Sequence, residues 1–194
     1  MRTIGTIVRL QVQRGSLKRG EKPARLYDPA PLLAVSTLNV SPDGALGASP
    51  ADGETWIVDV HHRAHPQTKN EDGLHGISVG FTSHYAAMQE HFGERVVVGC
   101  AGENIIANTD RQVRYEEVAG GVAILGPDGT ERVRLRVLQV AHPCKPFTGW
   151  ALGKQVEPDE MKKALQFLDN GMRGFYCTGE GTGTVSLGDS IAIV

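Results

Sequence analysis

The stretch "GPDGTERVRLRVLQVAHPCKPF", residues 126–147, joins a turn, a long strand and a cysteine held between two prolines. Its Gly-Pro-Asp-Gly start is typical of a turn that connects two antiparallel strands. In the run that follows, Val133, Leu135 and Val137 alternate with arginines and share one face, and then the apolar positions shift by one residue. A bulge, or burial of both faces, would explain the shift. The stretch therefore predicts a β-hairpin.

Short runs rich in Val and Ile recur along the rest of the chain. With 24 glycines and 10 prolines in 194 residues, turns between these runs should be frequent. Residues 41–54 and 18–31 are predicted to be loops, and the closing run "GTVSLGDSIAIV" (183–194) is predicted to form two short strands around a turn. The other predicted strands cover residues 4–12, 32–38, 55–60, 95–98, 105–107, 121–125, 133–140 and 173–177.

Two segments have the spacing of amphipathic helices. They are "TSHYAAMQEHFG" (82–93) and "PDEMKKALQFLDNG" (158–171), and both end in a glycine that can stop a helix. The second begins with a proline and two acidic residues, which favour a helix N-terminus. The sequence therefore predicts a mostly β fold with a few short helices.

The charge and the distribution of apolar residues exclude several classes of function. The 20 Lys and Arg against 22 Asp and Glu give a formal net charge of -2, which argues against binding to nucleic acid or to a membrane surface. No segment reaches the roughly 18 consecutive apolar residues of a membrane span, and residues 1–13 lack the apolar core of a signal peptide. We therefore expect a cytoplasmic protein whose 194 residues form one domain.

Cys144 is the first candidate for chemistry. It follows His142 and Pro143 and precedes Lys145 and Pro146. Each proline fixes its own φ and restricts the residue before it, so this backbone has few conformations. A cationic neighbour would favour the thiolate, which is the form that binds metal or attacks sulfur. The alternative is a buried cysteine at the end of a strand.

The other two cysteines are predicted to have packing roles. Cys100 lies between two small residues, and Cys177 ends a predicted strand. Because the three cysteines are an odd number and are widely spaced, a disulfide framework is not expected.

Histidines gather in "VDVHHRAHPQTKNEDGLHG" (58–76), which holds His61, His62, His65 and His75, with His84 beyond it. The proline after His65 and the glycines around His75 favour a strand followed by a loop over a helix. A loop of this kind can still assemble a zinc site, which leaves a zinc-dependent hydrolase as one alternative function. The other reading has one or two of these histidines in a pocket and the rest on the surface.

Two further motifs could contact a ligand. "GCAGENIIA" (99–107) has glycines that let the backbone approach a ligand, followed by Asn104, which can both donate and accept. "NGMRGFYC" (170–177) places Arg173 between glycines, where a guanidinium could bind phosphate. A tight turn and a solvated arginine are the simpler readings.

Taken together and in this order, these motifs resemble the MOSC domain family, named for the C-terminal domain of molybdenum cofactor sulfurase. The resemblance is strongest over residues 59–194. The motifs that carry it are "AGENI" (101–105), "HPCKPF" (142–147), "MRGFYC" (172–177) and "GTVSLGDSI" (183–191).

The resemblance implies a closed β-barrel and a pocket for a molybdopterin-type molybdenum cofactor. It implies that Cys144 is catalytic and ligates molybdenum. Our own hypothesis from side-chain chemistry is that His142 or His62 could supply a proton, because imidazole titrates near neutral pH. The residues expected to bind the cofactor are Gly102, Glu103, Asn104, Lys145, Arg173 and Gly174.

The function that the resemblance implies is reduction of N-hydroxylated substrates by a molybdenum-dependent oxidoreductase. The main alternative is a sulfur transferase, in which Cys144 carries a persulfide during cofactor or metal–sulfur assembly. The sequence contains neither a ferredoxin cluster motif nor a cysteine desulfurase domain. The expected partner is therefore an external electron donor for the first function, or a cysteine desulfurase for the second.

Overall fold

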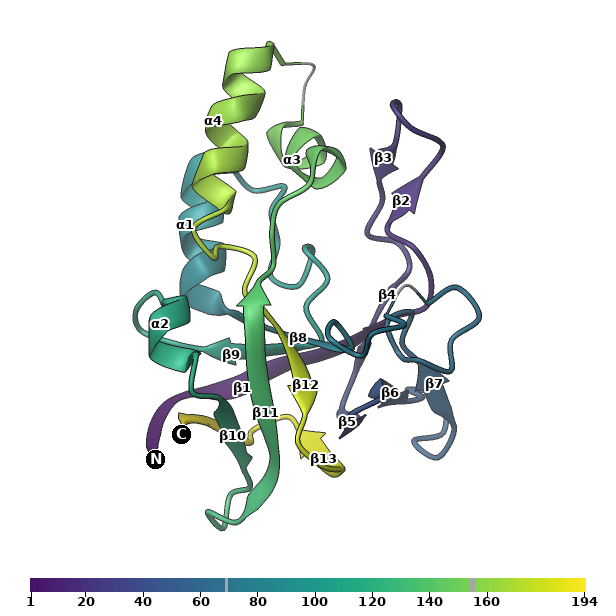
Figure 1. Cartoon of the computed structure of the whole chain (residues 1–194), viewed down its shortest axis with the longest axis vertical. Helices are drawn as coiled ribbons and strands as arrows, with labels where there is room; N and C mark the ends of the chain where they lie inside the picture. The colour runs from purple at the N-terminus through teal and green to yellow at the C-terminus, as the bar shows by residue number, and fades with distance from the viewer. Residues whose placement is uncertain (69, 154–155) are drawn as a thin grey trace.

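A closed β-barrel forms the base of the molecule (Figure 1). Over residues 1–68, 70–153 and 156–194, which the computed structural model describes, seven strands close this barrel. Neighbouring strands are antiparallel except β8 and β9, which are parallel. In order around the barrel the strands are β14 (Ser190–Ile193), β10 (Val122–Leu125), β11 (Glu131–Val140), β12 (Phe175–Gly179), β8 (Ile77–Phe81), β9 (Ile105–Asn108) and β1 (Arg2–Gln13), which pairs again with β14. The predicted mostly β, barrel-like fold is confirmed.

Shorter sheets surround the barrel. The far end of β1 pairs with β4 (Leu32–Val35), beyond the barrel itself. A second sheet runs in the order β13 (Gly183–Ser186), β5 (Thr37–Ser41), β6 (Gly44–Ala48) and β7 (Trp56–Val58). A small hairpin of β2 (Lys18–Arg19) and β3 (Leu26–Tyr27) extends away from the barrel (Figure 1).

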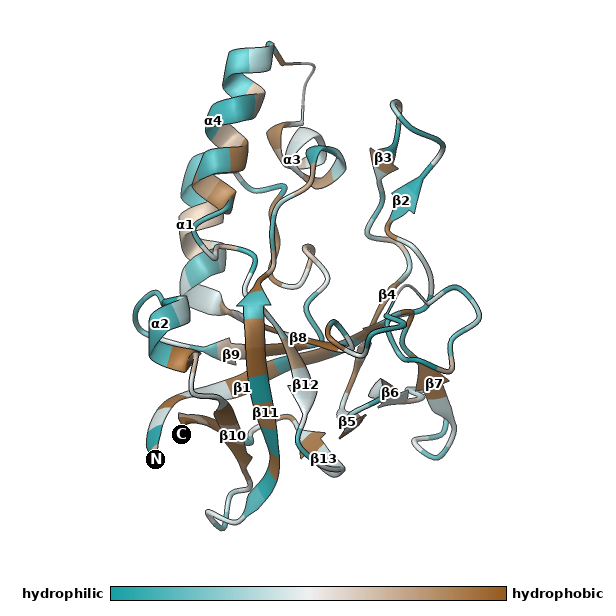
Figure 2. Ribbon diagram, viewed as in Figure 1, coloured by the Kyte–Doolittle hydropathy of each residue, from teal (hydrophilic) through white to brown (hydrophobic). Residues whose placement is uncertain are grey.

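The helices gather at one end of the barrel. They are α1 (Thr82–Phe92), α2 (Tyr115–Val118), α3 (Lys145–Leu152) and α4 (Pro158–Leu168). Figure 2 shows hydrophobic residues along β1, β10 and β11 and mostly hydrophilic residues along α4. One buried apolar cluster fills the barrel, and a second lies under the helices and includes Tyr27, Tyr85, Met88, Phe147 and Leu168. The pocket described below borders the second cluster, which shares Leu17, Tyr27 and Ala101 with its lining.

The stretch of residues 126–147 forms the predicted hairpin, with β10 and β11 on either side of its turn. The pairing of β11 with β12 shifts register between Val137 and Gln139. This bulge lies where the apolar pattern of the sequence shifts, so the prediction of a bulge is confirmed. It turns the end of β11 toward the cysteine loop.

Three predictions of local structure were wrong. Residues 95–98 form turns and no strand, because Val96 is buried in the helix-side cluster and Val97 faces solvent, with no neighbouring strand to pair with them. Residues 18–31 are not all loop, since they contain the paired strands β2 and β3. Residues 41–54 are not all loop either, since they contain β6. The glycines of β6 sit where a side chain would not fit: a Cβ on Gly47 would lie 2.8 Å from Val12 Cγ1.

Other differences between the predicted and the observed helices and strands affect the residues around the site. The fully buried strand β8 and the helix α3, which follows the prolines of the cysteine loop, were not predicted. The predicted strand over residues 173–177 begins only at Phe175, so Arg173 lies in the preceding turn. The two predicted helices are confirmed as α1 and α4. None of the helices in the described part of the chain is long and apolar enough to cross a membrane.

His84 has a structural position on α1. Its ring is buried, lies 5.2 Å from the Phe81 ring, and its Nε2 accepts a hydrogen bond from the main-chain N–H of Val113 (3.1 Å). Burial lowers the pKa of His84 to about 4, although hydrogen bonds to main-chain groups of Val113 and Gly171 oppose the change. The folded protein therefore holds this imidazole neutral.

This lowered pKa predicts a loss of stability in acid. The unfolded chain binds a proton at His84 below about pH 6.5 and the folded chain only near pH 4, so the free energy of unfolding should fall across that window. At about 1.4 kcal/mol per pKa unit, the total loss is about 3.5 kcal/mol. Urea unfolding of the wild type and of His84→Gln from pH 7.5 to 4 measures it. Equal pH dependence in the two proteins would contradict the assignment.

Candidate functional site

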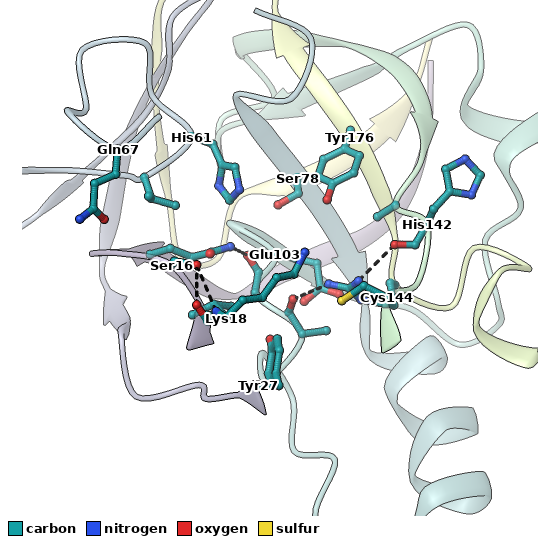
Figure 3. Close-up of a pocket in the computed structure, with 17 residues that line it drawn as sticks. Ser16, Lys18, Tyr27, His61, Gln67, Ser78, Glu103, His142, Cys144 and Tyr176 are labelled. Atoms are coloured by element: carbon teal, nitrogen blue, oxygen red, sulfur yellow. Dashed lines mark hydrogen bonds between the residues drawn. The ribbon is translucent and has the colours of Figure 1, made fainter. Parts of the chain in front are cut away.

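A pocket of about 180 Å³ opens between the barrel rim, the cysteine loop and the β2–β3 hairpin (Figure 3). Gly102 and Glu103 line it from the turn before β9, and Cys144 and Arg173 line it from the other side. His142 also lines the pocket, so the structure brings together five of the predicted site residues. The wall opposite them includes Gln13, Ser16, Lys18, Tyr27, His61 and Gln67, which the sequence analysis did not assign to the cofactor site.

Cys144 is held by the backbone of its own loop. It has extended geometry (φ -130°, ψ 147°) and is the N-cap residue of α3, with Pro146 in the first turn of that helix. Its carbonyl accepts hydrogen bonds from the main-chain N–H and the hydroxyl of Thr148, both at 3.0 Å. The side chain is half-buried at the pocket, so the thiol is positioned yet accessible.

The other two cysteines are buried, which confirms their packing role. Burial raises the pKa of the Cys100 thiol to about 12, with the Glu103 carboxylate adding to the effect, and burial also raises the pKa of Cys177. Both thiols therefore stay protonated at neutral pH, and neither is a reactive centre.

The turn of residues 99–103 is held by side chains of β1. The side-chain amide of Gln11 donates to the carbonyl of Gly99 (2.8 Å), and that of Gln13 donates to the carbonyl of Gly102 (2.9 Å). Gly102 has φ +99°, and a Cβ there would lie 2.8 Å from Gln13 Nε2. Only glycine fits this position, and its bare backbone faces the pocket.

Glu103 is a buried carboxyl group with an unused oxygen. Its Oε2 accepts a short hydrogen bond from the Tyr85 hydroxyl, whereas its Oε1 has no hydrogen-bond partner in the described parts of the chain. Burial raises the pKa of Glu103, although the Tyr85 hydroxyl and the Arg173 charge act in the opposite direction. A buried polar atom without a partner at the edge of a pocket is a natural contact for a ligand.

Arg173 connects the two sides of the pocket. One terminal nitrogen donates to the carbonyl of Ala101 (3.0 Å) and the other to the carbonyl of His142 (3.2 Å). The guanidinium lies 4.7 Å from the centre of the Phe147 ring, a cation–π contact. Its Nε is buried and unpaired among the residues that the structure places. The arginine thus joins the turn of residues 99–103 to the cysteine loop.

One histidine of the predicted cluster lines the pocket, as one of the two readings expected, but it is His61 and not His62. His61 lines the pocket, whereas the Nδ1 of His62 accepts from the main-chain N–H of Ala64 and His62 is not part of the lining. The imidazole of His142 turns away from the pocket and pairs with Asp169 (2.7 Å), so only the main chain of His142 faces Arg173 (Figure 3).

Three residues predicted to bind cofactor lie outside the pocket lining. The Asn104 side chain is committed to the interior, where its Oδ1 accepts from the main-chain N–H of Ser78 (3.0 Å) and its Nδ2 donates to Asp59 (2.9 Å). Lys145 begins α3, and Gly174 packs so closely that a Cβ would lie 2.0 Å from the carbonyl oxygen of Val79. Asn104 and Gly174 thus hold the walls of the site in place.

The histidine loop does not assemble a metal cage. Within residues 1–68, 70–153 and 156–194, no three His, Cys, Asp or Glu side chains form a group that could hold a metal ion. His75 instead contacts Gln139 and packs edge-on against Tyr176, at 5.0 Å between ring centres. The zinc hydrolase alternative has no support in this geometry.

The closed barrel and its pocket, lined by one accessible cysteine and by the buried Glu103, define a β-barrel protein with a cysteine-lined pocket. The comparison with family models identifies the family: residues 75–192 match the MOSC domain, and the chain belongs to that family. The match includes Glu103, Cys144 and Arg173, and it begins after the β2–β3 hairpin and His61 in the chain.

Solved structures with the same fold are distant in sequence. The YUAD protein of Bacillus subtilis has a TM-score of 0.56 and 14% identity, over 98% of this chain and 94% of that chain. YiiM of Geobacillus stearothermophilus has a TM-score of 0.51 and 15% identity, over 100% and 74%. YiiM of Escherichia coli has a TM-score of 0.51 and 16% identity, over 84% and 64%. No curated protein matches the sequence.

Proposed function

We propose that this protein binds a molybdopterin-type molybdenum cofactor in the pocket beside Cys144 and reduces N-hydroxylated compounds. One observation carries the proposal: the accessible Cys144 thiol lines the same pocket as Glu103, a buried carboxyl residue whose Oε1 has no hydrogen-bond partner among the described residues. Membership of the MOSC domain family supports it, because that family is linked to molybdenum cofactor binding.

The residues of the pocket fit this cofactor. The Cys144 thiolate is a soft ligand, and a metal that arrives with the sulfur ligands of its own cofactor needs only one from the protein. The pyrimidine edge of a pterin presents N–H groups that can donate hydrogen bonds to the Oε1 of Glu103. Lys18, which lines the mouth of the pocket, can pair with a phosphate. This assigns to Lys18 the contact that the sequence alone suggested for Arg173, whose terminal nitrogens already bind carbonyls.

The cofactor, when bound, would supply the two-electron redox chemistry. The chain would supply the rest: the rigid loop fixes the thiol, the 99–103 turn orients the pterin edge, and Tyr27 closes one wall by donating to the carbonyl of Cys100 (2.6 Å). The electrons would come from an external carrier, such as an iron–sulfur or flavin protein.

The first test is retention of the cofactor. Purified protein incubated with isolated molybdenum cofactor and then desalted should keep molybdenum and pterin in equal amounts, near one per chain. Steady-state assays with reduced methyl viologen and an N-hydroxylated purine or an amidoxime should then show reduction. A desalted protein that holds neither molybdenum nor pterin would overturn the proposed function.

A sulfur carrier is the second candidate, and the accessibility of Cys144 favours it as well. A desulfurase that holds a persulfide could pass its outer sulfur to the Cys144 thiolate, which would leave the desulfurase as a thiolate and Cys144 as a persulfide. Mass spectrometry after incubation with a desulfurase and cysteine would show a gain of one sulfur atom on the peptide that contains Cys144. If Cys144 gains no sulfur and the protein retains the cofactor, the sulfur carrier is excluded and the reductase proposal stands.

A further inference from the structure

A buried carboxylate lies directly behind the pocket. Asp59 is fully buried, and its Oδ2 accepts from the main-chain N–H of Gln13 (2.7 Å) and from the amide of Asn104 (2.9 Å). Its Oδ1 accepts from the main-chain N–H of His61 (2.8 Å). These three donors fix the carboxylate to β1, to the turn just before β9 and to the main chain of His61, so it cannot rotate.

The same Oδ1 holds the imidazole of His61. The His61 Nδ1 lies 3.1 Å from Asp59 Oδ1, and the ring points into the pocket (Figure 3). Because a carboxylate only accepts, the proton of the neutral ring belongs on Nδ1, and Nε2 is left free to take up or release a proton. His61 is thus a pocket-facing imidazole with its orientation and tautomer set by a second, buried residue.

Other histidines of the chain lack this arrangement. The rings of His62 and His65 each accept a local main-chain N–H through Nδ1, and His142 pairs with Asp169 away from the pocket. The family-model match begins at residue 75, so it assigns nothing to His61 or Asp59.

We propose that His61, oriented by Asp59, donates a proton to the substrate during the reduction, an inference that rests on the proposed function. In the overall reaction, R–NHOH takes two electrons from the external carrier and two protons, its N–O bond breaks, and R–NH₂ and water form. His61 Nε2–H supplies one of the two protons and is reprotonated from solvent, since the His61 side chain is 30% exposed.

Activity of the loaded protein gives the first test. In His61→Asn the amide nitrogen can replace Nδ1 as the donor to Asp59, while nothing replaces Nε2. We expect kcat to fall about 100-fold, a typical effect of losing a general acid, with KM and bound molybdenum unchanged. The matched control is His65→Asn, which keeps an acceptor for the main-chain N–H of Gln67 and should retain full activity. An unchanged kcat in His61→Asn would overturn the proposal.

Chemical rescue separates proton donation from a structural role. His61→Gly should be as slow as His61→Asn, and added imidazole should restore a measurable part of its activity, because the free base can enter the space that the ring vacated. A slow variant that imidazole does not restore would mean that His61 acts only by shaping the pocket, contrary to the proposal.

A measurement on the cofactor-free protein tests the orientation independently. ¹⁵N NMR of the histidine rings should show His61 as the Nδ1–H tautomer in the wild type and a shift toward the Nε2–H tautomer in Asp59→Asn. Finding the Nε2–H tautomer in the wild type would overturn the pairing. If the wild type retains no cofactor, the proposed function is wrong, and the role of His61 as proton donor is wrong with it. The tautomer measurement then still reports whether Asp59 orients His61.

Discussion

Replacement of Cys144 by serine should remove nearly all molybdenum from protein that has been loaded with cofactor and desalted. A serine hydroxyl stays protonated at neutral pH and is a poor ligand for a metal that favours sulfur, whereas the thiolate binds directly. Loss of even an outer-shell partner typically costs 10- to 100-fold in metal affinity, so the molybdenum content should fall at least about tenfold. Molybdenum per chain, measured by elemental analysis, gives the result.

Two controls make this measurement decisive. Serine has nearly the shape of cysteine, and the bonds from Thr148 go to the carbonyl of residue 144, so the melting temperature should not change. Cys100→Ala removes a buried thiol that does not line the pocket and should keep its molybdenum. Full retention of molybdenum in Cys144→Ser would show that this thiol is not the ligand, and the sulfur carrier would then be the better reading.

The sequence was sufficient to predict the barrel and the cysteine because both depend on local pattern. The alternation in β11, its shift at Leu138 and the prolines around Cys144 act over a few residues, and the structure follows them. The strand β6 was not predicted, because its glycines were interpreted as turn residues. In the structure Gly47 packs closely against Val12 of β1, and Gly44 packs closely against the main chain of His62.

The far wall of the pocket could not be predicted in this way. His61 and Lys18 reach the pocket only because the chain before β8 folds back across the barrel rim. No spacing in the sequence distinguishes His61 from His62, although one lines the pocket and the other does not. One signal was present: a lone aspartate after the apolar run of residues 56–58, two residues before His61, which is the kind of buried acid that orients a histidine.

Arg173→Met is expected to lower the free energy of unfolding by about 4 kcal/mol. The arginine donates one charged hydrogen bond to the carbonyl of Ala101 and one to that of His142, and hydrogen bonds to charged groups contribute about 1.5–3 kcal/mol each. Methionine fills similar space over Phe147 but offers no donor, so the carbonyls lose their partner. Urea unfolding at pH 7 measures the change.

Arg173→Lys separates the charge from the geometry of the guanidinium. Lysine keeps the positive charge beside Glu103 but cannot reach both carbonyls, so we expect it to recover only about half of the stability that methionine loses. With methionine, the charge that opposes the raised pKa of Glu103 is also lost, and that pKa should rise further.

An arginine kept only to bind a ligand phosphate would behave in the opposite way, because its removal would relieve a buried charge and leave the unliganded protein as stable as before, or more stable. The sign of the change in the free energy of unfolding of cofactor-free Arg173→Met therefore decides between two roles. A decrease shows that Arg173 connects the two halves of the pocket, and no change or an increase shows that it serves to bind an anion.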